Sequence, residues 1–300
     1  MVQESAPLIG ILRAHEAWLA KSTEGRQADL SGVTLNDQDL HGAVLRRAVL
    51  SGVTSLDTNF SGADLAGAKL DRGDFERANF AGADLTGCDL TGANFAGAWM
   101  NNACLSEASI REASFRLAKL SGARMLETTI SETCFRKVDG TLANLNQSRL
   151  FDVDWSESDL SQAQFYHTRL QFCRFQGIIA DGTNFGGSKL DHCDFTRAQL
   201  MNARFPRVEL TQCNFRDARL MDADFRDARV RGGDFSLAVL EGARFGGAQL
   251  LLADFRGANL LGARDLTAEQ LLQSLTDQKT ILPSGVHGPY MRHSGAERRR

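Results

Sequence analysis

The chain of 300 residues contains only 4 prolines, 6 cysteines and 2 tyrosines. So few cysteines in a chain of this length exclude a disulfide framework. No apolar run approaches the roughly 18 residues that span a bilayer. Residues 1–7 also lack the basic and apolar regions of a secretory signal. We therefore expect a cytoplasmic protein, and export by a signal-independent secretion system stays open.

Motifs of catalysis are absent as well. The sequence has no phosphate-binding glycine loop, no His-Glu-x-x-His, no Gly-x-Ser-x-Gly and no paired Cys-x-x-Cys. Its six histidines show no metal-ligand spacing. We therefore predict no catalytic residue, no cofactor and no metal, and we expect a protein that is not an enzyme. The net charge of −3 argues against a nucleic-acid partner.

What the sequence does have is a five-residue period. A large apolar residue occupies every position divisible by five from Leu30 to Leu260, except at Ser55, Gly140 and Ala180. The residue two positions earlier is small, and the residue immediately before the centre is mostly polar. This period fits neither a helix nor a strand. It requires a chain that turns inward twice in each unit, so that stacked coils bury one continuous core.

The unit A-[D/N]-[L/F]-x-x, as in the run Ala63-Asp64-Leu65-Ala66-Gly67, resembles the pentapeptide-repeat family over roughly residues 28–264. The resemblance implies an all-β solenoid, a right-handed quadrilateral β-helix with four repeats in each coil. On that geometry the 47 repeats make nearly 12 coils of 20 residues. Some members of the family resemble B-form DNA and bind DNA gyrase, and others act in bacterial secretion as effectors or adaptors.

The sizes of the central side chains support a coil of 20 residues independently of the family. Side chains 20 positions apart must then stack, and the sequence sorts them accordingly. Two columns, expected on opposite faces, are rich in aromatic residues, and the other two hold mainly Leu and Ile. One aromatic column is Phe75, Phe95, Phe115, Phe135, Trp155, Phe175, Phe195, Phe215, Phe235 and Phe255; the other becomes aromatic at Phe165, Phe185, Phe205, Phe225 and Phe245.

Both ends of the repeat region are expected to be covered by short helices, since open terminal coils would expose core and unpaired strand edges. Residues 1–27 form the N-terminal helical cap, with apolar residues at helical spacing from position 7 to 21. After the solenoid at 28–264, Thr267 and Gln270 have the spacing of a capping box, which predicts a C-terminal helical cap at 265–282. Residues 283–300 are predicted to be a flexible basic tail.

Two regular rows of polar or reactive residues have a structural explanation. Cys173, Cys193 and Cys213 should stack at inward small-residue positions. They either replace alanine in the core or form a ladder that binds a soft metal, and we favour the first interpretation. Asp154 and Asp194 share an outward column, but carboxylates just before the centre are a general property of the repeat.

Two outward rows exceed what the repeat requires. The first is a basic row in which Arg149, Arg169 and Lys189 stack and Arg229 continues after Glu209. Like charges at coil spacing repel. The row is therefore either a solvated face balanced by nearby acids or a binding site for an anionic partner.

The second row is apolar and lies on the opposite face. We call it the apolar stripe, because its five members lie in successive coils and could form a continuous surface. A protein partner, a second copy of the chain or the folded-back C-terminal tail would cover such a stripe. The alternative is scattered exposure without a role. Its members are Ile179, Met201, Met221, Val239 and Leu261.

These features predict a non-enzymatic scaffold or adaptor that binds another protein, or itself, through a face or an end of the solenoid. A link to a bacterial secretion system stays open. The alternative is a DNA mimic that binds DNA gyrase. Residues 28–263 carry 25 Lys and Arg against 30 Asp and Glu. That net charge of −5 is too weak for a mimic of a duplex with one charge per roughly 1.7 Å.

Overall fold

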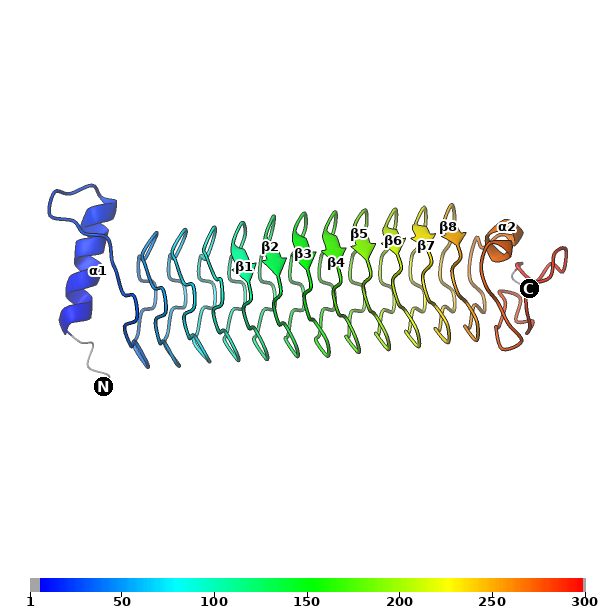
Figure 1. Cartoon of the computed structure of the whole chain (residues 1–300), viewed down its shortest axis with the longest axis horizontal. Coiled ribbons are helices and arrows are strands. Elements are labelled where there is room, and N and C mark those ends of the chain that lie inside the picture. Colours follow the sequence, from blue (N-terminus) through cyan, green and yellow to red (C-terminus); the bar gives the residue numbers. More distant parts are fainter. Residues whose placement is uncertain (1–5, 299–300) are drawn as a thin grey trace. The chain divides into compact units, whose positions relative to one another are not determined.

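The computed structural model describes residues 6–298. Residues 1–5 of the expected N-terminal cap, and Arg299 and Arg300 of the expected basic tail, lie outside the described residues. The chain divides into two compact units, one up to Ser148 and one from Arg149 onward. Each unit is a parallel β-solenoid in which the chain winds in successive coils (Figure 1). The predicted solenoid is thus confirmed, and its handedness, square cross-section and total of coils stay predictions.

Backbone hydrogen bonds between coils explain the register of 20. In a typical repeat the Leu65 N–H donates to the carbonyl of Asp84 at 2.8 Å, and the Gly67 N–H donates to the carbonyl of Thr86 at 2.8 Å. Each repeat thereby pairs its main-chain groups with those of the next coil, as buried backbone requires. The apolar centre points inward between these bonds, and Leu65 has no exposed surface.

The turn of each repeat explains the residues around the centre. The Ala68 N–H donates to the carbonyl of Leu65 at 2.8 Å and closes the turn. Gly67, inside that turn, has a φ of 69°, in the left-handed region that glycine enters without steric penalty. A carboxylate oxygen of Asp64 accepts a hydrogen bond from the Ala66 N–H at 3.2 Å. Side chains of this kind stabilise turns by such bonds, so the Asp and Asn before the centre serve the fold.

The first unit contains one helix and two short strands among its described residues. Helix α1 spans Ala6–Leu19, strand β1 spans Ser109–Arg111 and strand β2 spans Thr129–Ser131. The two strands pair in parallel, with Ile110 opposite Ile130. Elsewhere in the unit, single parallel bridges join residues 20 positions apart.

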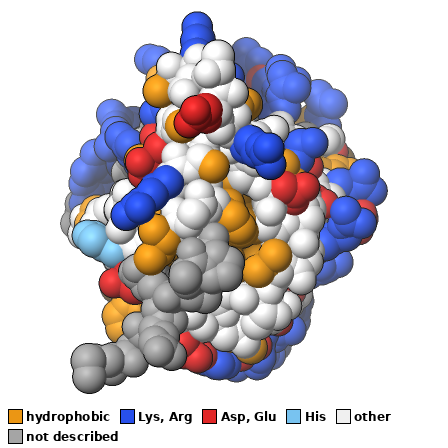
Figure 2. All heavy atoms as spheres, turned by 90° about the vertical axis from the view of Figure 1, so that its left-hand side faces the viewer, with side chains coloured by type: hydrophobic (Ala, Val, Ile, Leu, Met, Phe, Trp, Pro, Cys, Tyr) orange, Lys and Arg blue, Asp and Glu red, His pale blue; other side chains and the backbone are white. Residues whose placement is uncertain are grey.

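Helix α1 is joined to the first coils through His15, whose side chain is fully buried. The Ala28 N–H donates to Nδ1 of His15 at 3.0 Å, and Nε2 lies 3.1 Å from the carbonyl oxygen of Arg46. Because Nδ1 accepts a hydrogen bond, the proton of the neutral ring is on Nε2. Figure 2, which faces this end, shows small groups of hydrophobic side chains among Lys, Arg and polar residues. A helix is present where the sequence predicts one, and its function as a cap stays a proposal.

The second unit contains six strands and one short helix among its described residues. Each strand pairs in parallel with the next in chain order, in a register of 20 residues. The elements are β3 Arg149–Phe151, β4 Arg169–Gln171, β5 Lys189–Asp191, β6 Glu209–Thr211, β7 Arg229–Arg231, β8 Gln249–Leu251 and α2 Ala268–Leu272.

The core of this unit is a pair of aromatic columns. Phe195 stacks on Phe175 with ring centroids 4.7 Å apart and on Phe215 at 4.8 Å. It also meets Phe185 of the other column edge to face at 5.7 Å and an interplanar angle of 87°. Offset stacking and edge-to-face contacts are the favoured geometries of aromatic pairs. The two columns predicted from the sequence therefore stack and meet across a filled interior.

Residues 266–283 pair with the last coil of the second unit, where the Leu260 N–H donates to the carbonyl of Ile281 at 2.8 Å, and their function as a cap stays a prediction. Helix α2 begins with the predicted capping box, in which Thr267 and Gln270 satisfy each other's backbone donors. The Gln270 side-chain amide also donates to the carbonyls of Phe245 and Ala248, at 2.8 Å in both cases. Carbonyls that no further coil would cover are thereby bonded.

Residues 283–298, for which the sequence predicts a flexible tail, form hydrogen bonds in the structure. The Ser284 N–H donates to the carbonyl of Ala296 at 3.1 Å, and the Tyr290 N–H donates to the Thr276 hydroxyl at 2.9 Å. Tyr290 and Ala296 are buried. The glycines that suggested flexibility instead form turns, because Gly285 and Gly288 take left-handed φ values of 87° and 122°.

Candidate partner-binding face

In each strand of the second unit, the first and third side chains point outward and the middle side chain points inward. The middle residue of every strand is buried, and the two flanking residues are exposed or half-buried. We call the outward side of β3–β8 the sheet face. Its first column is Arg149, Arg169, Lys189, Glu209, Arg229 and Gln249, and its second is Phe151, Gln171, Asp191, Thr211, Arg231 and Leu251.

The structure brings the predicted basic row together. Arg149 lies opposite Arg169, and Arg169 lies opposite Lys189. The Glu209 carboxylate binds Nζ of Lys189 at 2.9 Å and lies 3.9 Å from Arg229. Within residues 6–298, the guanidinium groups of Arg149 and Arg169 form no ion pair. The row is therefore balanced at its Glu209 end and carries uncompensated positive charge on β3 and β4.

An aromatic cluster that the sequence reasoning missed adjoins these two arginines. Phe151, at the end of β3, is 46% exposed, and Phe172, directly after β4, is 47% exposed. Their ring centroids are 5.7 Å apart in an edge-to-face contact, and Phe172 stacks on the His192 ring at 5.2 Å. We call Phe151, Phe172 and His192 the aromatic cluster. The signal was present, since these are the two phenylalanines outside the five-residue register.

The backbone at Phe172 adopts the left-handed turn of the repeat. Its φ of 56° lies in the left-handed region, where a bulky side chain is an outlier. Other turns place glycine at the same position of the repeat, as at Gly182 with a φ of 68°, or another large residue, as at Leu237 with a φ of 60°. The Phe172 ring lies outside the core, and its ring contacts are with Phe151 and His192.

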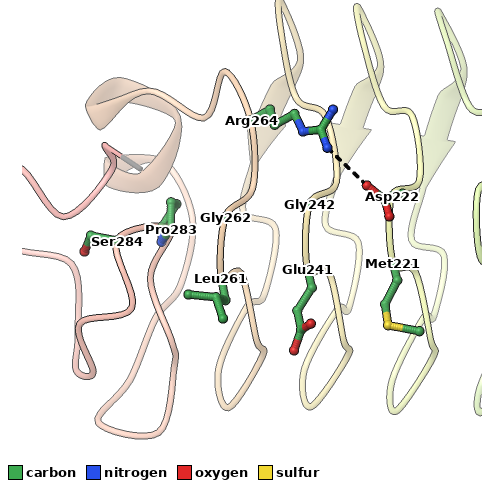
Figure 3. A pocket seen from close by; sticks show the side chains of 9 residues that line it. All are labelled: Met221, Asp222, Glu241, Gly242, Leu261, Gly262, Arg264, Pro283 and Ser284. Atoms are coloured by element: carbon green, nitrogen blue, oxygen red, sulfur yellow. Dashed lines mark hydrogen bonds and ion pairs between the residues drawn. The ribbon is translucent and has the colours of Figure 1, made fainter. Parts of the chain in front are cut away.

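The apolar stripe is not continuous, contrary to the expectation from the sequence. Met201 and Met221 lie in neighbouring coils, but Glu241 stands between Met221 and Leu261 (Figure 3). In the adjacent column, Gln199 and Arg219 separate Ile179 from Val239. The expectation failed because it took one apolar residue from each coil without fixing its column.

The tail approaches one end of the stripe without covering it. A shallow hollow of about 480 Å³ is lined by residues that include Met221, Leu261 and Pro283. Arg264 bridges it with an ion pair to Asp222 at 3.4 Å (Figure 3). Leu261 remains 45% exposed. The hollow is polar around its apolar residues, so it offers little contiguous apolar surface.

The turn carboxylates and the three stacked cysteines are engaged in the fold. Asp194 accepts a hydrogen bond from the Thr196 N–H at 2.9 Å, as the turn requires. Cys173, Cys193 and Cys213 are buried, and burial raises the pKa of the Cys193 thiol, with its cysteine neighbours adding to the effect. The Cys193 thiol donates a hydrogen bond to the carbonyl of Leu170 at 3.6 Å, as a cysteine packed in the core can. The described part of the chain holds no group of three or more His, Cys, Asp or Glu placed to bind a metal.

No helix within residues 6–298 is long and apolar enough to cross a membrane.

Comparisons with known proteins find the repeat along most of the chain. Models of "Pentapeptide repeats (8 copies)" match residues 26–54, 58–97, 88–125 and 103–139. A model of a "Pentapeptide repeat region" matches 148–215, and "Pentapeptide repeats (9 copies)" match 215–259. No curated protein matches the sequence significantly.

Solved structures with a similar fold include repeat proteins and an enzyme. HetL from the cyanobacterium Nostoc sp. strain PCC 7120, a pentapeptide repeat protein involved in the regulation of heterocyst differentiation, is 23% identical. That match covers 84% of this chain and 92% of HetL, with a TM-score of 0.33. QnrB1, a plasmid-mediated fluoroquinolone resistance protein, is 13% identical over 74% of this chain and 89% of its own, with a TM-score of 0.44.

A mannuronic acid specific polysaccharide lyase from human gut microbiota is 12% identical over 89% of this chain and 66% of its own, with a TM-score of 0.32. All three likenesses concern the fold alone.

Proposed function

The chain belongs to the pentapeptide-repeat family, and on that premise we propose that it is a non-enzymatic scaffold or adaptor that binds a protein partner through the sheet face. The observation that carries the proposal is the unpaired positive charge of Arg149 and Arg169 beside the exposed rings of Phe151 and Phe172. Arginine and aromatic residues are the types enriched at the energetic centres of protein interfaces.

The fold itself has no need of these side chains. The same column of the first unit holds Ser109 and Thr129 at the positions that correspond to Arg149 and Arg169. A stacked pair of arginines repels by Coulomb's law unless a counter-charge is present. A partner that carries the counter-charge would remove this repulsion, whereas no ion pair among residues 6–298 does so.

The engagement of the turn carboxylates supports the non-enzymatic part of the proposal. Catalytic sites are concave and hold titratable groups with perturbed environments. Here the turn carboxylates, such as Asp194 and Asp254, accept hydrogen bonds from their own turns.

DNA mimicry gains no support from the sheet face, because the face presents Arg149, Arg169 and Arg231 where a mimic of the duplex needs carboxylates.

The experiment is affinity purification with mass spectrometry from the native host. Three tagged forms of the full chain are compared: the wild type, the double variant Arg149→Ser with Arg169→Ser, and the double variant Met201→Asp with Met221→Asp. Serine is chosen because Ser109 occupies the same column. Circular dichroism verifies that all three are folded.

We expect one protein, or one complex, to be retained by the wild type and the methionine variant and lost by the arginine variant. Loss with the methionine variant alone would move the binding surface to the apolar stripe and contradict the assignment to the sheet face. Equal capture by all three forms would show that neither surface binds the partner. Hydrolase or lyase activity of the purified chain would contradict the non-enzymatic function.

A further inference from the structure

The β3–β5 part of the sheet face fits a ligand that carries acidic and aromatic side chains. We propose that the partner docks there through an extended acidic segment that contains an aromatic residue. Carboxylates of the segment bind Arg149 and Arg169, and its ring packs on the aromatic cluster of Phe151, Phe172 and His192. This inference rests on the proposed function and adds the chemical class of the partner.

Charge complementarity is the first argument. The carboxylates near the two arginines are engaged elsewhere: Asp152 binds Arg174 at 3.2 Å, and Asp191 binds His192 at 2.8 Å. Arg149 and Arg169 are therefore exposed guanidinium groups without a counter-charge in the described chain. Guanidinium groups bind carboxylates through two parallel hydrogen bonds, so an acidic side chain is their natural ligand.

The distance between the arginines and the rings is the second argument. Arg149 and Phe151 are the first and third residues of β3, and at about 3.3 Å per residue they lie roughly 6.6 Å apart along the strand. Neighbouring strands add about 4.8 Å in the perpendicular direction. An acidic residue and an aromatic residue one to three positions apart in an extended peptide span the same distances. One short segment thus reaches both the arginines and the aromatic cluster.

The arrangement of acids on the face favours a peptide over a nucleic acid or an anionic membrane. Glu209 interrupts the basic row two strands beyond Arg169, and Asp191 lies beside Lys189 in the second column. A nucleic-acid strand has a negative charge at every nucleotide, and an anionic bilayer has a continuous negative surface. Either ligand would bring negative charge against these carboxylates and be repelled by them. A peptide can confine its acids to the residues opposite the two arginines and leave the rest of the face without contact.

The test measures the binding of a fluorescein-labelled peptide, Gly-Glu-Glu-Asp-Phe-Glu-Asp-Gly, to the full chain by fluorescence anisotropy. The first control peptide has serine in place of phenylalanine, and the second has glutamine and asparagine in place of the acids. Labelled oligothymidylate of ten nucleotides and sedimentation with phosphatidylserine vesicles test the other two classes of ligand.

We expect the acidic aromatic peptide to bind most tightly and to weaken as salt is raised. The amide peptide should bind about tenfold more weakly because the ion pairs are lost. The Arg149→Ser/Arg169→Ser variant should lose a similar factor of about ten. Phe172→Asn should lose about fivefold toward this peptide and little toward the serine peptide. Leu237→Asn is the matched control, because Leu237 is also exposed in a left-handed turn with a φ of 60°.

Several results would overturn the inference. These are no binding of the acidic aromatic peptide to the wild type, equal binding of the amide peptide, and tighter binding of oligothymidylate or vesicles. If the peptide fails while the arginine variant still loses its captured partner, the chemical class is wrong and the proposed function stands. If the capture is also insensitive to the arginines, both are wrong.

Discussion

The substitution Phe172→Asn tests whether Phe172 is a binding residue or a structural residue. The substitution removes an exposed ring and keeps the backbone of the turn, since asparagine tolerates the left-handed conformation that Phe172 adopts at a φ of 56°. We expect the free energy of unfolding to change little, because two effects of opposite sign act at this position.

The destabilising effect is the loss of the ring. Phe172 is 47% exposed, so about half of the roughly 1.5–3 kcal/mol for a fully buried side chain is at stake. The contacts with Phe151 and His192 add about 0.5 kcal/mol for a pair of exposed rings. The stabilising effect is release of left-handed strain, about 1 kcal/mol. The net change should be a destabilisation of about 1 kcal/mol or less.

The assay is equilibrium unfolding in urea, with the peptide titration performed on the same preparations. Leu237→Asn undergoes the same exchange of backbone strain against apolar contact, at an exposed turn residue outside the sheet face. It should resemble Phe172→Asn in stability and the wild type in binding. A loss of more than about 2 kcal/mol in Phe172→Asn alone would show that the ring supports the fold, and its exposure would then be no sign of function.

Three further predictions concern the fold. Phe195→Ala removes a fully buried ring that contacts three others, so the unfolding free energy should fall by about 3–5 kcal/mol in urea titrations; a loss below about 1 kcal/mol would contradict the packed core. Ser55 is buried at an apolar centre, and its hydroxyl has no hydrogen-bond partner in the described chain, so Ser55→Ala should raise stability by about 1 kcal/mol in thermal unfolding, and destabilisation would refute this. Burial lowers the pKa of His15, so its contribution should be complete above the unfolded pKa of about 6.5 and decrease as pH falls below it. The hydrogen-exchange protection of the Ala28 amide should then fall from pH 7 to pH 5, and unchanged protection would contradict this prediction.

The sequence was sufficient to predict the solenoid and its register because both depend on a pattern repeated at every fifth and twentieth position. The stacking of Phe175, Phe195 and Phe215 required only that equal side chains recur 20 positions apart. The helix after Thr267 was predictable because a capping box is local. The folded tail was not predictable, since Tyr290 and Ala296 are buried by contacts that no local signal announces.

The candidate site was predictable only in part, for the same reason. Arg149, Arg169 and Lys189 form a row because a single column fixes them. The apolar stripe was drawn across two columns, although the period of 20 already places Gln199 and Arg219 between Ile179 and Val239. The aromatic cluster joins a strand residue, Phe151, to a turn residue in the next coil, Phe172. Only the three-dimensional structure of the turn after β4 places these two rings in contact.

Outward positions of the repeat are the place where function can be read, because the fold leaves them free. Inward positions are fixed by packing, and the position before the centre is constrained by the turn that its side chain stabilises. At β1 and β2 the free column holds Ser109 and Thr129, which satisfy the fold without charge. At β3 and β4 the same column holds two arginines that repel each other, and the residue after β4 is a phenylalanine in a strained turn. Each of these choices destabilises the free chain slightly, and all of them lie within one patch. A single acidic, aromatic ligand would offset all of these effects together, which is why the sheet face at β3–β5 is a stronger candidate than the scattered apolar residues of the stripe.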